Sequence, residues 1–255
     1  MPERPHQPGN KATRSGARPG ALRDARQVRE MFGRIVRRYD TMNRLMTGGR
    51  DVAWRRLAAR IAVGGAPNAA PVLDLATGTG DLALALNAAG AKRVVGLDAA
   101  APMVRAAAMK TRGQRDVALV VGDALSLPFA DGQFAACTVS FGLRNMADYE
   151  AALREMSRVL GPGGRLVCLE LTPFRRPVLG RLFAWYFSNI VPTIGGLLSG
   201  DKEAYRYLPS SVAAFPSADA LAELMRRAGL ADVSYRLLGA GTVALHVGVK
   251  AAPRA

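Results

Sequence analysis

The sequence predicts an α/β protein built on a mostly parallel sheet. Short apolar runs alternate with amphipathic helical segments through the middle of the chain, and this alternation is typical of parallel strands joined by helical crossovers. The first run, Val72–Ala76, leads directly into a glycine-rich turn, and the last two runs are joined by Gly239–Gly241. The short connection indicates a closing antiparallel hairpin. A length of 255 residues is enough for one large domain with its own core.

Two helices are expected ahead of the sheet. Apolar residues recur at three- and four-residue spacing from Arg26 to Ala62, with arginines on the other faces, and Thr47–Gly49 divides the segment. The strands that follow are predicted at Val72–Ala76, Arg93–Asp98, Val117–Val121, Phe134–Ser140, Arg165–Leu171, Asp232–Leu238 and Thr242–Val249. The helices between and after them are predicted at Asp81–Ala89, Pro102–Thr111, Tyr149–Leu160 and Ala218–Ala228.

We expect a single domain over residues 26–255, in which residues 26–66 form the N-terminal helices. Residues 1–25 are basic and rich in Pro and Gly, which is typical of a disordered tail. Residues 172–216 interrupt the strand–helix alternation and are rich in aromatic residues, Gly and Pro. We interpret this insertion as a lid or pocket for an apolar substrate, with a local helical core as the alternative.

The formal net charge of +15 favours a polyanionic partner, either an anionic membrane surface or nucleic acid. The first residues contain no apolar stretch like that of a secretory signal, and the longest apolar region, Leu182–Leu198, is broken by Pro and Gly. We therefore expect a cytoplasmic protein that is peripheral on the inner face of the cell membrane. Cys137 and Cys168 lie in apolar runs, and their spacing indicates neither a disulfide nor a metal site.

A glycine loop predicts a ligand site at the start of the sheet. The segment Val72–Leu82 reads as a strand, a turn containing Gly78 and Gly80, and the start of a helix. Glycine lets the backbone bend sharply and approach a ligand, and the helix start offers free N–H groups. Asp98 ends the next predicted strand, where a carboxylate accepts hydrogen bonds from a ribose. The pattern predicts an adenosine-type cofactor, either a nicotinamide dinucleotide or S-adenosylmethionine.

Two further acids favour S-adenosylmethionine. Asp74 lies inside the first strand, where a nicotinamide-binding strand is usually apolar, and it is placed to receive the amino group of a methionine moiety. Asp123 follows the third strand and is placed to accept a hydrogen bond from an adenine amine. The closing hairpin also suits a methyltransferase sheet better than a dehydrogenase.

These residues resemble the Rossmann-like class I methyltransferases, which have a mostly parallel seven-stranded sheet, a C-terminal antiparallel hairpin and, here, N-terminal helices. The match is closer to the quinone-biosynthesis C-methyltransferases that act on demethylmenaquinone and on the related ubiquinone precursor. It covers about residues 27–250, and it is carried mainly by four segments: Phe32–Asn43, Gly122–Phe129, Ser140–Asn145 and Tyr205–Ser210. The loop Ala76-Thr77-Gly78 departs from the family in lacking a second glycine or a cysteine before Gly78.

The resemblance implies an S-adenosylmethionine-dependent C-methyltransferase acting on a polyprenyl quinol. It places cofactor contacts on Thr79, Asp98, Asp123 with Ala124, and Ser140. For the transfer itself, Arg144 is a candidate to stabilise a developing phenolate, because a fixed cation is effective in a dry site. Tyr205 and Tyr39 are candidates to orient a ring hydroxyl.

The sequence leaves several functions open beside this one. An RNA methyltransferase fits the charge, but the fourth strand is followed by Ser140-Phe-Gly-Leu instead of an Asn/Asp-Pro-Pro-Tyr motif, so we expect no nucleic acid partner. A methyltransferase for a different lipid-like small molecule, a nicotinamide oxidoreductase and a non-catalytic scaffold also fit parts of the pattern. No metal ligand set is predicted. The proton acceptor is open between Asp148, Glu170 and water, and a homodimer is one of the open oligomeric states.

Overall fold

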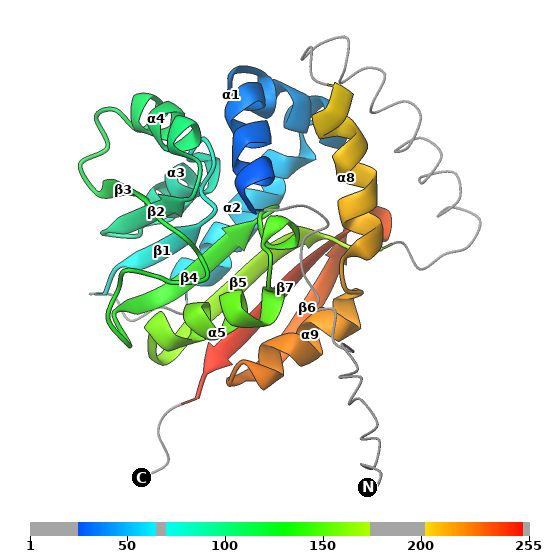
Figure 1. The fold of residues 1–255 in the computed structure, drawn as a ribbon. Helices are drawn as coiled ribbons and strands as arrows, with labels where there is room; N and C mark the ends of the chain where they lie inside the picture. Colours follow the sequence, from blue (N-terminus) through cyan, green and yellow to red (C-terminus); the bar gives the residue numbers. More distant parts are fainter. Residues whose placement is uncertain (1–24, 65–69, 174–201, 252–255) are drawn as a thin grey trace, which may run out of the picture.

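A twisted seven-stranded sheet forms the centre of the protein (Figure 1). The computed structural model describes residues 25–64, 70–173 and 202–251. The strands lie in the order β3-β2-β1-β4-β5-β7-β6. Their bounds are β1 Val72–Leu75, β2 Val94–Asp98, β3 Val117–Val121, β4 Phe134–Ser140, β5 Leu160–Leu171, β6 Leu230–Leu238 and β7 Val243–Lys250. Strands β1 to β5 pair in parallel, and β7 pairs antiparallel with both β5 and β6, which confirms the predicted fold class.

Helices cover both faces of the sheet. Their bounds are α1 Ala25–Thr47, α2 Arg50–Val63, α3 Asp81–Ala88, α4 Ala101–Lys110, α5 Tyr149–Val159, α8 Lys202–Ala214 and α9 Ala218–Arg227, with short 3-10 turns η1 Leu143–Asn145 and η3 Gly239–Gly241. Leu153 of α5 and Leu221 of α9 belong to one buried apolar cluster with β1, β4 and β5. Ala59 of α2 and Leu86 of α3 belong to a second cluster on the opposite face. The parallel strands are therefore buried on both sides, as a parallel sheet requires.

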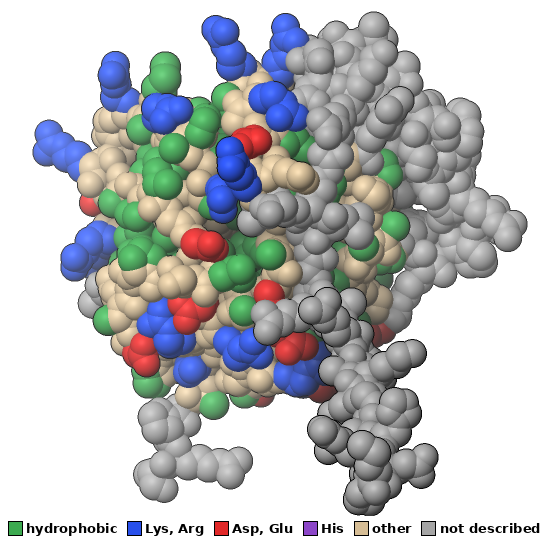
Figure 2. Space-filling view, in the orientation of Figure 1, with side chains coloured by type: hydrophobic (Ala, Val, Ile, Leu, Met, Phe, Trp, Pro, Cys, Tyr) green, Lys and Arg blue, Asp and Glu red, His purple; other side chains and the backbone are tan. Residues whose placement is uncertain are grey.

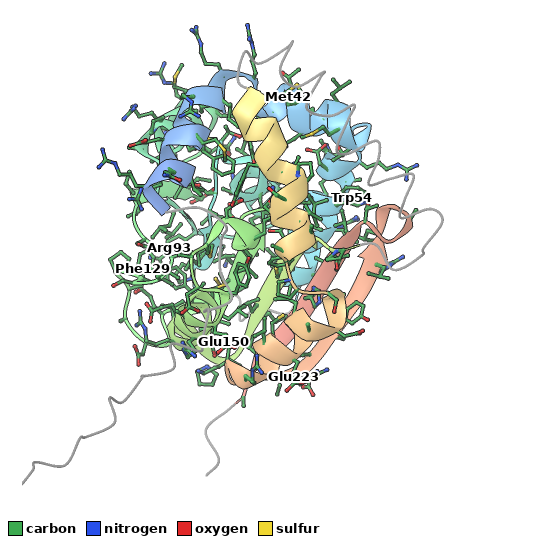
Figure 3. The ribbon with its side chains drawn as sticks, turned by 45° about the vertical axis from the view of Figure 1, so that its right-hand side comes forward. Met42, Trp54, Arg93, Phe129, Glu150 and Glu223 are labelled. Carbon is green, nitrogen blue, oxygen red and sulfur yellow. The ribbon has the colours of Figure 1, made fainter. Side chains whose placement is uncertain are left out.

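Helix α1 lies across the upper edge of the sheet in Figure 1, between α4 and α8. Val28, Met31, Ile35 and Met42 of α1 form a third apolar cluster with Tyr207 of α8. Figure 3 shows Met42 near the upper end of the α1–α8 pair of helices. It also shows Trp54 of α2 facing the β6–β7 connection. A methyl group built on Gly239 would lie 3.0 Å from Trp54, so the N-terminal helices are packed closely onto the C-terminal hairpin.

The structure differs from the sequence prediction mainly at element ends. Strand β5 begins at Leu160 and not at Arg165, because Leu160 pairs with Phe134 before the chain passes through Gly161–Gly164. Helix α2 starts directly after Gly49, at the division predicted from Thr47–Gly49, and Gly49 is in a left-handed conformation at φ 75°. Apart from Ala25, the predicted tail lies outside the described residues, and so does most of the predicted 172–216 insertion. Among the described helices, none has the length and apolar character needed to cross a membrane.

Candidate active site

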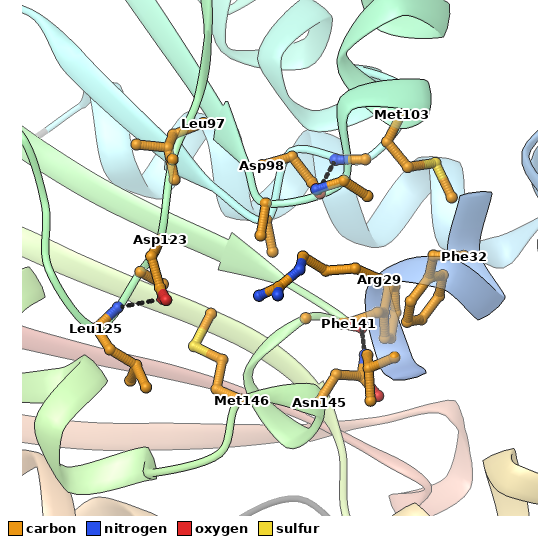
Figure 4. A pocket seen from close by; sticks show the side chains of 18 of the residues that line it. Arg29, Phe32, Leu97, Asp98, Met103, Asp123, Leu125, Phe141, Asn145 and Met146 are labelled. Atoms are coloured by element: carbon orange, nitrogen blue, oxygen red, sulfur yellow. Dashed lines mark hydrogen bonds between the residues drawn. The ribbon is translucent and has the colours of Figure 1, made fainter. Parts of the chain in front are cut away.

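A cavity opens where β1, β2 and β4 end, below α1. It is partly open to solvent, and its lining is mostly apolar (Figure 4). The sheet and its loops contribute Ala76, Gly78, Leu97, Asp98, Gly122, Asp123, Ala124, Leu125 and Ser140. Helices α1 and α4 and the segment after β4 contribute Val28, Arg29, Phe32, Tyr39, Met103, Phe141, Gly142, Asn145, Met146 and Ala147. The carboxyl ends of parallel strands are where open α/β sheets bind their ligands.

The glycine loop forms one wall of this cavity. Ala76, Gly78 and Gly80 all have positive φ, at 50°, 56° and 85°, so the chain reverses sharply between β1 and α3. At Gly80 glycine is also required for space, because a methyl group there would lie 3.3 Å from Ala107 of α4. The loop therefore presents backbone, without side chains, to a ligand at Gly78.

Asp98 is the acid of the cavity with the most defined contacts. Its Oδ2 accepts a hydrogen bond from the N–H of Gly78 at 2.9 Å, and its Oδ1 accepts one from the N–H of Ala100 at 2.8 Å. Burial raises the pKa of this carboxyl, and the two backbone N–H groups oppose that rise. The same side chain thus joins the end of β2 to the glycine loop and faces the cavity, as the sequence predicted from its spacing.

Asp123, Ala124 and Ser140 also line the cavity, at the ends of β3 and β4. The Oδ1 of Asp123 accepts a hydrogen bond from the N–H of Leu125 at 2.9 Å (Figure 4). The hydroxyl of Ser140 is buried and has no hydrogen-bond partner within the part of the chain that the structure describes. A buried polar atom without a partner is costly, and a bound ligand would satisfy it.

Asp74, Thr79 and Gly80 stand behind the cavity and do not line it. Asp74 is 1% exposed, and it accepts hydrogen bonds from Thr77 at 2.6 Å and Thr138 at 3.0 Å. Burial raises the pKa of its carboxyl to about 7. Thr79 donates to Asp40 of α1 at 2.6 Å. In this structure Asp74 bonds the glycine loop through Thr77, and Thr79 links the loop to α1 through Asp40.

An ionic cluster ties α1 to the glycine loop. Lys110 of α4 contacts Asp40 of α1 at 2.5 Å, Asp81 of α3 at 2.6 Å and the hydroxyl of Thr79 at 3.1 Å. Arg44 of α1 pairs with Asp81 at 3.3 Å. Sequence reasoning missed this cluster, since its members are up to 70 positions apart and no local pattern joins them.

Arg144, the predicted catalytic cation, lies in the buried turn η1 and does not line the cavity. Its Nη1 donates to Glu170 at 2.7 Å and to the carbonyl of Phe141 at 2.6 Å, and its backbone N–H also donates to Glu170. Its neighbours Phe141, Asn145 and Met146 do line the cavity. The Glu170 ion pair therefore fixes the turn that presents these neighbours.

The two tyrosines named from the sequence have different outcomes. Tyr39 lines the cavity beside the glycine loop, and a methyl group built on Gly78 would lie 3.9 Å from its Cε1. Burial raises the pKa of Tyr39, while the positive charges of Arg144 and Arg55 oppose the rise. Tyr205 belongs to α8, but its side chain lies outside the described residues.

The remaining titratable candidates have structural partners. His246 is buried in β7, where its Nε2 lies 2.8 Å from the carbonyl of Ala218, and burial lowers its pKa. Asp148 caps α5 by accepting the N–H of Ala151 at 2.9 Å. Cys137 and Cys168 are buried free thiols. Over the described ranges no cluster of His, Cys, Asp or Glu fits a metal ion.

Solved structures show the same fold in proteins with different chemistry. The [4+2]-cyclase SpnF superimposes with a TM-score of 0.67 at 20% identity, over 92% of this chain and 99% of that protein. The CurJ carbon methyltransferase superimposes with a TM-score of 0.56 at 18% identity, over 75% of this chain and 51% of that one. At this identity the likeness defines the fold and leaves the reaction to the site and to closer relatives.

The fold, the glycine loop and Asp98 together define the class I methyltransferase architecture. Within that class, the model of the ubiE/COQ5 methyltransferase family matches residues 21–250, and the chain belongs to this family. A relative named demethylmenaquinone methyltransferase, from Thermus thermophilus, is 51% identical over 86% of this chain and 99% of its own length. Another, named ubiquinone/menaquinone biosynthesis C-methyltransferase UbiE, from Desulfotalea psychrophila, is 42% identical over 88% of this chain and 90% of its own.

Membership of the family confirms the enzyme class and the cofactor, S-adenosylmethionine, that the sequence predicted. The residues of the cavity fit that cofactor. Asp98 has two acceptor positions left over, which would suit the two hydroxyls of a ribose. Asp123 has one carboxylate oxygen left over, which would suit a donor such as an amine of the cofactor. The buried hydroxyl of Ser140 has no hydrogen-bond partner among the described residues, and a ligand could supply one.

Proposed function

We propose that this chain transfers the methyl group of S-adenosylmethionine to a ring carbon of a polyprenyl quinol. The reaction would convert demethylmenaquinol to menaquinol or act on the equivalent ubiquinol precursor. The names of the relatives carry this proposal: at 51% and 47% identity over nearly their full lengths, two of them are called demethylmenaquinone methyltransferase. An open, mostly apolar cavity supports it, because the quinol ring and the start of its isoprenoid chain are apolar.

In the proposed arrangement the cofactor lies along the ends of the strands. Its ribose hydroxyls would donate to Asp98, and its adenine would lie between Ala124 and Asp123, with Asp123 accepting from the exocyclic amine. The methionine part would lie against the backbone of Gly78 and accept a hydrogen bond from the hydroxyl of Ser140. Thr79, Gly80 and Asp74 would act indirectly, by holding the loop in shape.

The quinol would occupy the part of the cavity between Tyr39 and Asn145. Alignment of donor and acceptor with exclusion of water supplies most of the acceleration in such a displacement. As the quinol loses a proton, negative charge develops on its oxygen. Arg144 lies behind the wall of the cavity in a buried ion pair with Glu170, so its stabilisation of this charge would be offset in part by the Glu170 carboxylate. The catalytic roles of Arg144 and Tyr205 stay predictions, and so does the lid formed by residues 172–216.

The reaction can be tested with purified chain, methyl-labelled S-adenosylmethionine and a demethylmenaquinol with a short isoprenoid chain. We expect mass spectrometry to detect a quinol in which one ring hydrogen has been replaced by the labelled methyl group. An RNA pool and an O-methylatable catechol serve as control acceptors. If the chain binds S-adenosylmethionine but labels a control acceptor and not the quinol, the proposed substrate is wrong.

We also propose that the enzyme works at the surface of an anionic membrane, where a polyprenyl substrate would lie. At the end of the molecule formed by α1 and α4, the charged side chains visible in Figure 2 are mostly basic. Arg37 and Arg38 are exposed on α1, and Met109 of α4 is 77% exposed. A basic residue near an anionic bilayer contributes about 1 kcal/mol, and salt screens it.

Co-sedimentation with vesicles tests the membrane proposal. We expect binding to vesicles that contain phosphatidylglycerol, loss of this binding at high salt, and little binding to vesicles of phosphatidylcholine alone. The double variant Arg37→Glu, Arg38→Glu should bind less, whereas Arg226→Glu on α9 should bind as the unmodified chain does. Equal binding to both kinds of vesicle, or none to either, would contradict the proposal. The homodimer stays a prediction.

A further inference from the structure

Arg29 is the one arginine among the residues that line the cavity in the described part of the chain. It lies in the first turns of α1 and is half-buried. Figure 4 shows its side chain extending from α1 across the cavity, with the guanidinium directed toward Asp123 and Met146. No hydrogen bond or ion pair links this guanidinium to another described residue, although two carboxylates, Asp98 and Asp123, line the same cavity.

The two ends of α1 meet different parts of the cavity. Tyr39 lies beside Gly78 of the glycine loop. Arg29 is ten residues earlier on the same helix, which places it roughly 15 Å away along the axis. Its surroundings there, Leu97, Asp123, Leu125 and Met146, come from the ends of β2 and β3 and from the segment after η1. The backbone of Arg29 is therefore farther from the glycine loop than that of Tyr39, and its guanidinium is directed toward the Asp123 side of the cavity (Figure 4).

The position of Arg29 decides which part of the cofactor it meets. If the ribose lies at Asp98 and the amino acid part lies at Gly78, the purine must lie beyond Asp98, toward Asp123. The carboxylate of the methionine part, the other group that attracts an arginine, would then lie at the Tyr39 end. A guanidinium is flat, weakly hydrated and delocalised, and it stacks on the faces of aromatic rings, including nucleobases.

We propose that Arg29 is a cofactor-binding residue whose guanidinium stacks on the exposed face of the adenine ring. Leu97 and Met103 line the same cavity, and Arg29 reaches into it from α1 (Figure 4). Asp123 lines the same cavity, and the guanidinium is directed toward its carboxylate (Figure 4). The inference rests on S-adenosylmethionine being the cofactor, and it does not depend on the quinol.

The test compares ligand affinities of the unmodified chain with those of Arg29→Ala and Arg29→Lys by titration calorimetry. The ligands are S-adenosylmethionine and 5′-methylthioadenosine, which keeps the adenine and the ribose but lacks the amino acid part. We expect Arg29→Ala to weaken both ligands by the same factor, about tenfold, which corresponds to about 1.4 kcal/mol. Arg29→Lys keeps the charge but not the planar group, and it should recover little of either affinity.

The matched control is Arg37→Ala, which removes an exposed arginine from the same helix outside the cavity lining. It should change neither affinity, and all variants should melt at the temperature of the unmodified chain. Weakening of S-adenosylmethionine alone would assign Arg29 to the carboxylate and overturn the proposal. Full recovery by Arg29→Lys, or unchanged affinities in Arg29→Ala, would overturn it as well. If the unmodified chain binds neither ligand, the cofactor assignment itself fails.

Discussion

Replacement of Asp98 by alanine tests the cofactor site at the acid whose contacts are best defined. The two carboxylate oxygens accept the backbone N–H groups of Gly78 and Ala100 at 2.9 and 2.8 Å. An ionised carboxylate has about four acceptor positions, so two stay available for the two hydroxyls of a ribose. The side chain holds the glycine loop, and in the proposed arrangement it would bind the cofactor through the same pair of oxygens.

The size of the effect follows from these contacts. A hydrogen bond to a charged acceptor contributes about 1.5–3 kcal/mol, so the loss of two bonds to ribose costs at least about 3 kcal/mol of binding. At about 1.4 kcal/mol per factor of ten, the dissociation constant of S-adenosylmethionine should rise more than about 100-fold. The cofactor-free protein should also melt several degrees lower, because the N–H groups of Gly78 and Ala100 lose their acceptor.

Titration calorimetry and thermal melting of the cofactor-free chain measure the two effects separately. Asp131→Ala is the matched control, since it removes an acid that is 81% exposed and does not line the cavity. Asp98→Asn should fall between alanine and the unmodified chain, because an amide oxygen still accepts one of the two N–H groups. An affinity for Asp98→Ala within about threefold of the unmodified chain would remove Asp98 from the ribose site.

Three further predictions concern the residues that support the cavity. Lys110→Met should weaken the binding of S-adenosylmethionine severalfold and speed amide hydrogen exchange in α1, because Asp40 and Asp81 lose their shared cation. Unchanged exchange would show that the ionic cluster does not hold α1 in place. Arg144→Ala should destabilise the fold by about 3–5 kcal/mol by leaving Glu170 buried without a cation. Adding Glu170→Gln should restore much of the melting temperature but not the turnover; normal turnover in this double variant would make Arg144 purely structural. For Asp74, a pKa raised to about 7 means that the folded protein holds a proton that the unfolded chain releases near pH 4, so this carboxyl lowers stability as pH rises toward 7. Asp74→Asn should remove this loss, at about 1.4 kcal/mol per pH unit, and parallel stability–pH curves for the two proteins would refute it.

The sequence predicted the strands and most helices because their patterns are local. A continuous apolar run such as Phe134–Ser140 indicates a strand buried on both faces, and β4 has those bounds. Element ends were less well predicted where distant pairing decides them. The start of β5 at Leu160 depends on Phe134, which is 26 positions away and leaves no mark in the sequence around Leu160.

The cavity was predicted in part for the same reason. Asp98 was predicted as a cavity residue because the glycine loop and the acid keep a fixed spacing across one strand–helix–strand unit. Arg29 was not predicted as a cavity residue. On an arginine-rich helix, no local sequence pattern distinguishes the arginine that faces the cavity from the arginines that face solvent. Its neighbours Val28 and Phe32 carried a weak signal, because both contribute to the apolar cluster of α1 and also line the cavity. Arg144 shows the converse. Its buried ion pair with Glu170 requires a contact between the turn η1 and the end of β5, and the spacing in the sequence cannot reveal this contact.

The position of β7 has a consequence for the synthesis of the protein. This strand follows β6 in the chain but lies between β5 and β6 in the sheet, pairing with β5 from Arg165–Val249 to Leu171–Val243. Until β7 has left the ribosome, the edge of β5 has no neighbour, and the apolar residues of α9 have no completed sheet to pack on. Pairing over such sequence separations is slow, and unpaired strand edges promote aggregation. The nascent chain should therefore depend on chaperones until its final strand has been translated.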